Sequence, residues 1–181
     1  MNQNYNYIVL NDSSWHNRIH ALEHVNDREI LLKVALNDYD YRIRHNAIKK
    51  ISNQNHLFQI ALNEKDSHIA CEAIRKIESS DKLKDIILKR NEQEIQFCAV
   101  SKINNDNILK YLLNKITEPS VISKIISLLS DEEPLLEIAL DGSFLCRTHA
   151  IKRILKLNKP YSVNILSKSK DYFIRQFFKD K

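Results

Sequence analysis

Turn-forming residues are scarce in this chain of 181 residues, which contains one glycine, Gly142, and three prolines. Tight hairpin turns and phosphate-binding loops both depend on glycine, because its backbone reaches conformations that other residues avoid. The scarcity therefore argues against a sheet-rich fold and against a glycine-rich nucleotide loop. The sequence also contains no G-x-S-x-G, Walker, H-E-x-x-H or dinucleotide-binding motif, so we expect neither an enzyme nor a cofactor.

Cysteine is limited to Cys71, Cys98 and Cys146, an odd number with no C-x-x-C pair. This usage argues against a disulfide framework or a zinc knuckle and favours a reducing, cytoplasmic location. Residues 1–7 lack the basic and apolar regions of a signal peptide, and no apolar stretch approaches the length of a membrane span. We therefore expect a cytoplasmic protein that does not associate with membranes.

The composition is otherwise that of a folded domain, with 43% hydrophobic and 28% charged residues. The net charge is +5 and the isoelectric point is about 9.0. A mildly basic surface of this kind is compatible with nucleic acid or with an acidic protein partner, and it does not choose between them.

An internal repeat is the most informative feature that is present. The segment DYDYRIRHNAIKKI, which ends at Ile51, matches EKDSHIACEAIRKI, which ends at Ile77. The centres of successive copies are spaced by 26 residues, at Ala21, Ala47, Ala73 and Ala99, and the register continues through Ile125, Ala150 and a looser copy at Phe178. About seven copies account for the chain. We therefore predict a single repeat domain over residues 1–181.

Each copy contains two helix patterns. In the second helix of one copy, Ile43, Ala47, Ile48 and Ile51 recur at spacings of three and four, which is a helical period. Residues suited to an N-cap precede the second helices at Ser14, Asp40, Asp66 and Asp171, and Pro119, Pro134 and Pro160 fall near helix starts. Such short units bury their apolar stripes only by stacking. The sequence predicts an all-α fold, a right-handed α-solenoid of about seven helical hairpins.

Regularity ends in the later copies. Copy five has Ile125 at its centre and Leu128 where earlier copies have a cation. The last copy contains the aromatic residues Tyr172, Phe173, Phe177 and Phe178. Because a terminal repeat must cover the last core face, we favour a cap packed on the preceding copy over an exposed end.

The stretch L-x-x-I-A-L-N-x-x-D-x-x-I-x-x-x-A-I-x-K-I, from Leu57 to Ile77, and its copies resemble short HEAT-like repeats, including those of the phycobiliprotein-lyase type. The resemblance covers essentially the whole chain. It implies the architecture and says almost nothing about function, since such repeats serve many partners.

In HEAT-like arrays the second helices usually line the concave face. Advancing 100° per residue from the central alanine, positions −5, −2, −1 and +2 lie opposite the core. The predicted groove residues are Arg42, His45, Lys49, His68, Cys71, Arg75 and Phe97. The groove is basic in its N-terminal half and carries two exposed apolar residues, Cys71 and Phe97. Phe97 is either an interface anchor or a residue packed on a neighbouring helix edge.

Position +3 forms a nearly continuous basic ladder, whose members are Lys50, Lys76, Lys102 and Arg153. We favour a structural role, because cations near a helix C-terminus are stabilised by the dipole and their stems cover apolar neighbours. The alternative is a row of cations matched to an anionic polymer. Arg18, Arg44, Arg147 and Arg175 share position −3, and with Asp40 and Asp66 they predict an Asp–Arg ladder between repeats.

His16, His20 and His24 recur at four-residue spacing, and such a pair chelates metal in some proteins. We expect no carboxylate or cysteine to complete a site, and therefore a solvated polar face and no metal. Cys71 and Cys98 are expected to be neighbours without a redox role.

Two functions follow from this pattern. The first is a non-catalytic adaptor whose groove binds a protein or peptide. The alternative is binding of a DNA or RNA backbone, as in the HEAT-like alkylpurine DNA glycosylases. Those enzymes rely on aromatic residues and a carboxylate in the groove, whereas the one tryptophan here, Trp15, begins a helix of the first copy. The oligomeric state is left open.

Overall fold

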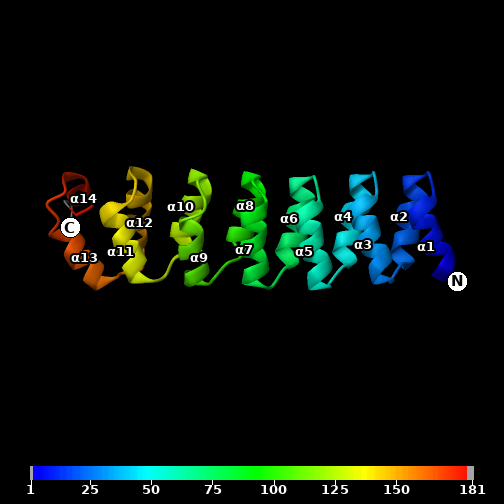
Figure 1. The fold of residues 1–181 in the computed structure, drawn as a ribbon, viewed down its shortest axis with the longest axis horizontal. Coiled ribbons are helices and arrows are strands. Elements are labelled where there is room, and N and C mark those ends of the chain that lie inside the picture. Colours follow the sequence, from blue (N-terminus) through cyan, green and yellow to red (C-terminus); the bar gives the residue numbers. More distant parts are fainter. Residues whose placement is uncertain (1, 179–181) are drawn as a thin grey trace. The chain divides into compact units, whose positions relative to one another are not determined.

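The computed structural model describes residues 2–178, and every regular element within that range is an α-helix (Figure 1). The all-α prediction is confirmed. The helices of the described range are α1 (Asn2–Asn11), α2 (Trp15–His24), α3 (Arg28–Asn37), α4 (Tyr41–Lys50), α5 (Gln54–Asn63), α6 (Ser67–Lys76), α7 (Ser80–Lys89), α8 (Gln93–Val100), α9 (Asp106–Leu113), α10 (Pro119–Leu128), α11 (Glu132–Asp141), α12 (Phe144–Lys156), α13 (Pro160–Ser167) and α14 (Tyr172–Gln176). Over these residues, each helix is too short or too polar to cross a bilayer.

The contacts within the chain define two compact units, unit 1 (Met1–Lys102) and unit 2 (Ile103–Lys181). Unit 1 contains α1–α8 and unit 2 contains α9–α14. The prediction of one continuous repeat domain is not tested by this division and stays a prediction.

In unit 1 each odd-numbered helix packs against the even-numbered helix that follows it. The even-numbered helices also pack in series, α2 on α4, α4 on α6 and α6 on α8, and so do the odd-numbered helices from α1 to α7. The expected core positions are buried, as Ile43, Ala47 and Ile48 show with no exposed surface. A residue without a large side chain at the centre of each second helix lets the neighbouring helices approach closely.

Short polar residues start the helices as the sequence predicts. The carboxylate of Asp66 accepts hydrogen bonds from the backbone N–H groups of His68 and Ile69, and Asp171 caps α14 in the same way. Asp40 caps α4 with one such bond, from the N–H of Arg42. Ser14 stands at the N-cap of α2, but its side chain makes no capping bond. These caps satisfy donors that the first turn of a helix leaves without an intrahelical acceptor.

Unit 2 follows the same pairing with less regular elements. Helix lengths range from 5 residues in α14 to 13 in α12, and Ile125 is fully buried at the centre of α10. The aromatic residues of the last copy act partly as a cap, because the Phe173 ring lies 4.8 Å from that of Phe144 in α12. Most of Tyr172, by contrast, is exposed to solvent (69%).

Candidate functional site

The second helices of unit 1 share a face opposite their buried edge, which we call the second-helix face. It is formed by His16, His20 and Glu23 of α2, Arg42, His45 and Lys49 of α4, His68, Glu72 and Arg75 of α6, and Glu94 and Phe97 of α8. All of these residues are exposed or half-buried. The face therefore contains six of the seven predicted groove residues.

Arg42 is held by two neighbours. Its Nε and Nη2 atoms donate to the two carboxylate oxygens of Asp40 at 3.0 and 2.6 Å. Its guanidinium carbon also lies 3.7 Å from the centre of the Trp15 ring. The Arg42 guanidinium lowers the pKa of Asp40 to about 2. A molecule that docks here meets a neutralised pair rather than a free cation.

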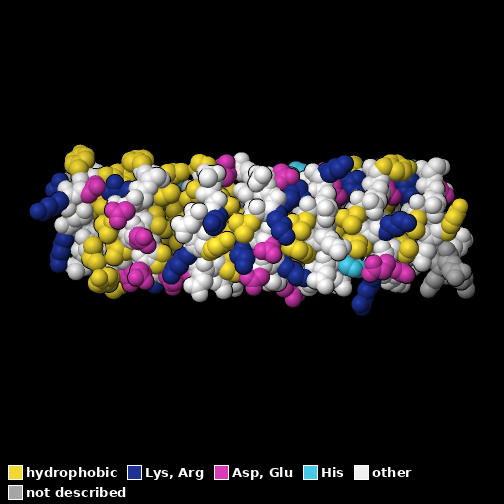
Figure 2. Space-filling model, in the orientation of Figure 1, with side chains coloured by type: hydrophobic (Ala, Val, Ile, Leu, Met, Phe, Trp, Pro, Cys, Tyr) yellow, Lys and Arg dark blue, Asp and Glu magenta, His cyan; other side chains and the backbone are white. Residues whose placement is uncertain are grey.

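The other charges of the face are mixed in sign. Arg75 pairs with Glu72 of its own helix, and Nδ1 of His68 lies 3.0 Å from Oε1 of Glu94, which joins α6 to α8. Lys49 is exposed and makes no ion pair with another described residue. On the side of unit 1 visible in Figure 2, basic and acidic side chains are likewise interspersed.

The two apolar groove residues differ in exposure. Phe97 is 43% exposed, as predicted, whereas Cys71 is only 2% exposed, so its prediction as an exposed residue is wrong. The physical reason is the adjacent helix: Sγ of Cys71 lies 3.8 Å from the carbonyl oxygen of Glu94, and Sγ of Cys98 lies 3.8 Å from that of Cys71. Burial raises the pKa of the Cys71 thiol to about 12, which leaves it unreactive. The two cysteines are neighbours, as expected.

The basic ladder binds main-chain oxygens of the preceding second helix. Nζ of Lys50 donates to the carbonyls of Leu22 and Glu23 at 2.8 and 2.7 Å. Nζ of Lys76 donates to Ile48 and Lys49 at 3.0 and 2.8 Å. These carbonyls lie at helix C-termini, where the last four oxygens lack intrahelical donors.

The rest of the ladder repeats this contact. Lys102 donates to the carbonyls of Arg75 and Ile77, and in unit 2 Nε of Arg153 donates to Leu129 at 2.8 Å. These bonds agree with a structural role, but the acceptors belong to the neighbouring helix, whereas the sequence had suggested the dipole of each residue's own helix. The four cations of the ladder therefore already have hydrogen-bond acceptors within the protein.

The predicted Asp–Arg ladder in unit 1 uses different acids. Arg18 forms a two-point ion pair with Asp38 at 2.8 and 2.9 Å, and Arg44 forms one with Glu64 at 2.8 and 3.1 Å. The prediction of Asp40 and Asp66 as the acidic partners is wrong: both carboxylates cap helices, and Asp40 also pairs with Arg42 of the helix it caps. In unit 2, Asp171 caps α14 and also lies 2.6 Å from Nη2 of Arg147.

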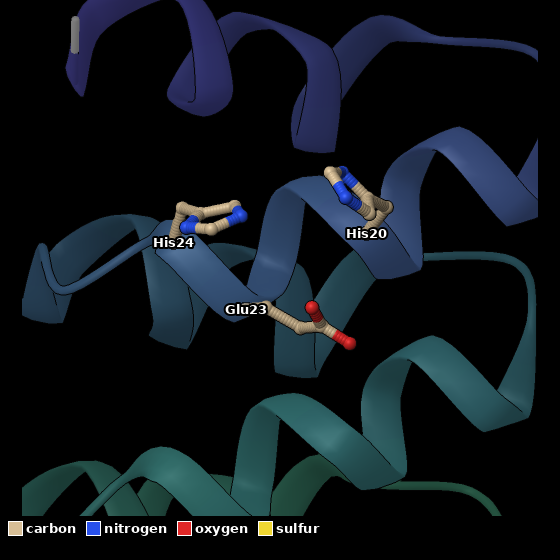
Figure 3. A group of neighbouring side chains, drawn as sticks. All are labelled: His20, Glu23 and His24. Carbon is tan, nitrogen blue, oxygen red and sulfur yellow. The ribbon is translucent and has the colours of Figure 1, made fainter.

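A cluster of possible metal ligands lies on α2, where His20, Glu23 and His24 gather at one edge of the second-helix face (Figure 3). One ligand atom from each residue lies within 4.8 Å of the others. Residues three and four apart are neighbours on a helix surface, so the expectation that no carboxylate joins the histidines is wrong. His16 is not part of the cluster, and its ring lies 3.7 Å from that of Trp15.

No protein-family model, curated protein or solved structure matches this chain. The resemblance to HEAT-like repeats consequently depends on the sequence motifs, and it stays a prediction.

Proposed function

We propose that this chain is a non-catalytic binding scaffold that holds a protein or peptide on the second-helix face of unit 1. The proposal includes HEAT-like repeats, about seven in number, as a right-handed α-solenoid. Its support is the 26-residue sequence register together with the serial packing of the helices within each unit. A cytoplasmic location fits the three free thiols.

One observation carries the choice of a protein over a nucleic acid: most of the predicted cations already have partners within the chain. The ladder lysines bond main-chain carbonyls, and Arg42 and Arg75 pair with carboxylates of Asp40 and Glu72. Binding of a nucleic-acid backbone depends on many cations that neutralise phosphates and release counterions. A face of paired charges with an exposed phenylalanine has the composition of a protein interface instead.

The face suggests the chemistry of the partner. The exposed ring of Phe97 offers an apolar contact, and the ammonium of Lys49 attracts a negative charge. Aromatic residues that become fully desolvated commonly dominate the free energy of association. We therefore expect a segment that combines an apolar side chain with one or more carboxylates.

The test is selection of ligands from a random peptide display library, followed by titration of the selected peptides in solution. Truncation of an interface anchor costs about 2 kcal/mol, or roughly thirtyfold in Kd, and we expect this loss for Phe97→Ala. Leu88→Ala is the matched control, because Leu88 lies on α7 and is 38% exposed, close to the value for Phe97.

Titrations with mixed-sequence duplex DNA and single-stranded RNA complete the experiment. The proposal would be wrong if nucleic acid binds saturably near physiological salt, with a steep salt dependence, and Phe97→Ala leaves the Kd of every selected peptide unchanged. Equal losses for Phe97→Ala and Leu88→Ala would move the binding site away from the second-helix face.

A further inference from the structure

We propose that His20, Glu23 and His24 form a binding site for a divalent transition-metal ion of the zinc type, with a coordination position left open to solvent. The site lies on α2 and is distinct from Phe97 and Lys49, so it does not depend on the proposed function.

The helix itself gathers the ligands. Positions i, i+3 and i+4 lie side by side on a helix surface, and the ligand atoms of the three residues are all within 4.8 Å of one another. Zinc ligands at about 2.0–2.1 Å from the metal in a tetrahedron lie roughly 3.3 Å apart. The separations must therefore shrink by at most about 1.5 Å, a movement that rotation of exposed side chains supplies without a change in the backbone.

A neighbouring helix orients one of the ligands. The ring of Tyr5 in α1 stacks on His24, with centroids 4.4 Å apart and an interplanar angle of 27°. Stacking uses the face of the imidazole, whereas the lone pair that binds a metal lies in the ring plane. The ring is thus held in place while its nitrogen atoms stay accessible. The His20 and His24 rings are 5.4 Å apart, and Figure 3 shows both on the same side of α2, at different positions along the helix.

The donor atoms select the class of ion. Two imidazoles and a carboxylate suit zinc and its transition-metal neighbours, whereas magnesium and calcium prefer sets made of oxygen. Three protein ligands leave the fourth tetrahedral position for water. Within the described range, no side-chain hydrogen bond or ion pair occupies the carboxylate of Glu23 or the ring nitrogens of the two histidines.

The ammonium of Lys50 lies near the proposed site and weakens the binding of a metal ion. The ammonium of Lys50 lies 2.7 Å from the carbonyl oxygen of Glu23, so it is bound to the backbone and leaves the carboxylate available. Its positive charge nevertheless repels a second cation nearby. We therefore expect reversible binding rather than the permanent retention typical of closed structural zinc sites.

The experiment is calorimetric titration of the full, tag-free chain with zinc, and with magnesium as a negative control. We expect saturable binding of one zinc ion per chain and no response to magnesium. Removal of outer-shell groups costs roughly tenfold to a hundredfold in metal affinity, so His20→Ala, Glu23→Gln and His24→Ala should each cost at least about tenfold.

His16→Ala is the matched control, because His16 lies on the same helix, is exposed, and forms the competing four-residue pair with His20. It should leave the affinity for zinc unchanged. Circular dichroism in the presence of a chelator checks that all variants keep the fold. The visible absorption of cobalt in place of zinc gives a second readout, since coordination by the cluster changes the spectrum and a folding defect alone does not.

Three results would overturn the proposal. The first is no saturable zinc binding by the wild-type chain. The second is a large loss for His16→Ala together with full affinity in His24→Ala, which would place the ion on His16 and His20. The third is full affinity in Glu23→Gln, which would remove the carboxylate from the site.

Discussion

Units 1 and 2 pack the same kind of helix pairs with different regularity. In unit 1, helices α2 to α7 are each 10 residues long, and the central positions Ala47 and Ala73 are fully buried. In unit 2 the helices vary in length, and the equivalent position of α10 holds Ile125. The comparison teaches that the helices of uniform length in unit 1 contain small central residues, and that a larger central residue such as Ile125 fits only where its neighbours leave room for it.

The contacts between successive second helices are also more regular in unit 1 than in unit 2. Unit 1 uses Lys50, Lys76 and Lys102 on the carbonyls of preceding helices, and unit 2 uses Arg153. The corresponding position of α10 holds Leu128, which has no donor to offer. The buried ion pairs of unit 1 also contrast with the more exposed Arg147–Asp171 pair of unit 2.

The largest expected effect comes from the buried ion pair of unit 1. The side chains of Arg18 and Asp38 are 2% and 5% exposed, so Arg18→Ala leaves a buried carboxylate without its partner. We expect a loss of about 3–5 kcal/mol in the free energy of unfolding. Arg147→Ala in unit 2 should cost clearly less, because the side chain of Asp171 is 40% exposed and solvent screens the pair. Urea denaturation of both variants measures the difference, and equal losses would remove this distinction between the units.

Exchange of the central residues tests the packing difference. Ile125→Ala should cost about 2–5 kcal/mol, because it opens a cavity at a fully buried position. The reverse change in unit 1, Ala73→Ile, should cost about 1–3 kcal/mol through overpacking. Hydrogen exchange followed by mass spectrometry assigns each loss to its own unit. Tolerance of isoleucine at position 73 would show that small central residues are not required for the regular period.

A smaller effect is expected from the ladder. Lys76→Met keeps the apolar stem but leaves the carbonyls of Ile48 and Lys49 without their donor, at a cost of about 1–2 kcal/mol. Burial lowers the pKa of Lys76, so its ammonium has already lost hydration that the carbonyls replace. Lys49→Met, at the adjacent exposed position, should stay within about 0.5 kcal/mol of the wild type. Thermal unfolding of the two variants and of Arg153→Met shows whether both units depend on this contact. Equal stabilities of Lys76→Met and Lys49→Met would argue against a stabilising role for the lysine-to-carbonyl bonds.

The smallest expected effect depends on pH. Arg42 lowers the pKa of Asp40 to about 2, below its value in the unfolded chain. The stabilisation is therefore complete above about pH 4 and is lost as the pH falls toward 2, by about 1 kcal/mol for a partly solvated pair. Asp40→Asn should remove this part of the acid sensitivity, because asparagine still caps the helix but does not titrate. If the free energies of unfolding of wild type and variant stay parallel from pH 5 to pH 2, the Asp40–Arg42 pair is not a source of the acid sensitivity.

Much of the helical pattern could be predicted because it depends on local periodicity. The apolar spacing around Ala47 and the cap at Asp66 each involve residues within one or two turns of each other, and the structure confirms both. The exposure of Phe97 follows from the same helical wheel.

The remaining contacts depend on neighbouring helices, which a single wheel does not contain. Cys71 lies on the outward side of α6, yet α8 covers it. Arg18 pairs with Asp38, at the end of α3, whereas the carboxylate of Asp40 caps α4 and pairs with Arg42 of that helix. Glu23 could have been found from the sequence, because it is three residues from His20 and such residues are neighbours on a helix surface.

The lysine-to-carbonyl contact has a consequence for how such a chain can change. Each lysine binds main-chain carbonyls at the end of the second helix of the preceding copy. Every helix ends in such carbonyls, whatever its side chains. A segment of one period can accordingly be duplicated, deleted or exchanged, and its lysine still finds main-chain carbonyls to bind. The joint is independent of the residues that face outward, so the number of modules and the chemistry of their surface can diversify separately.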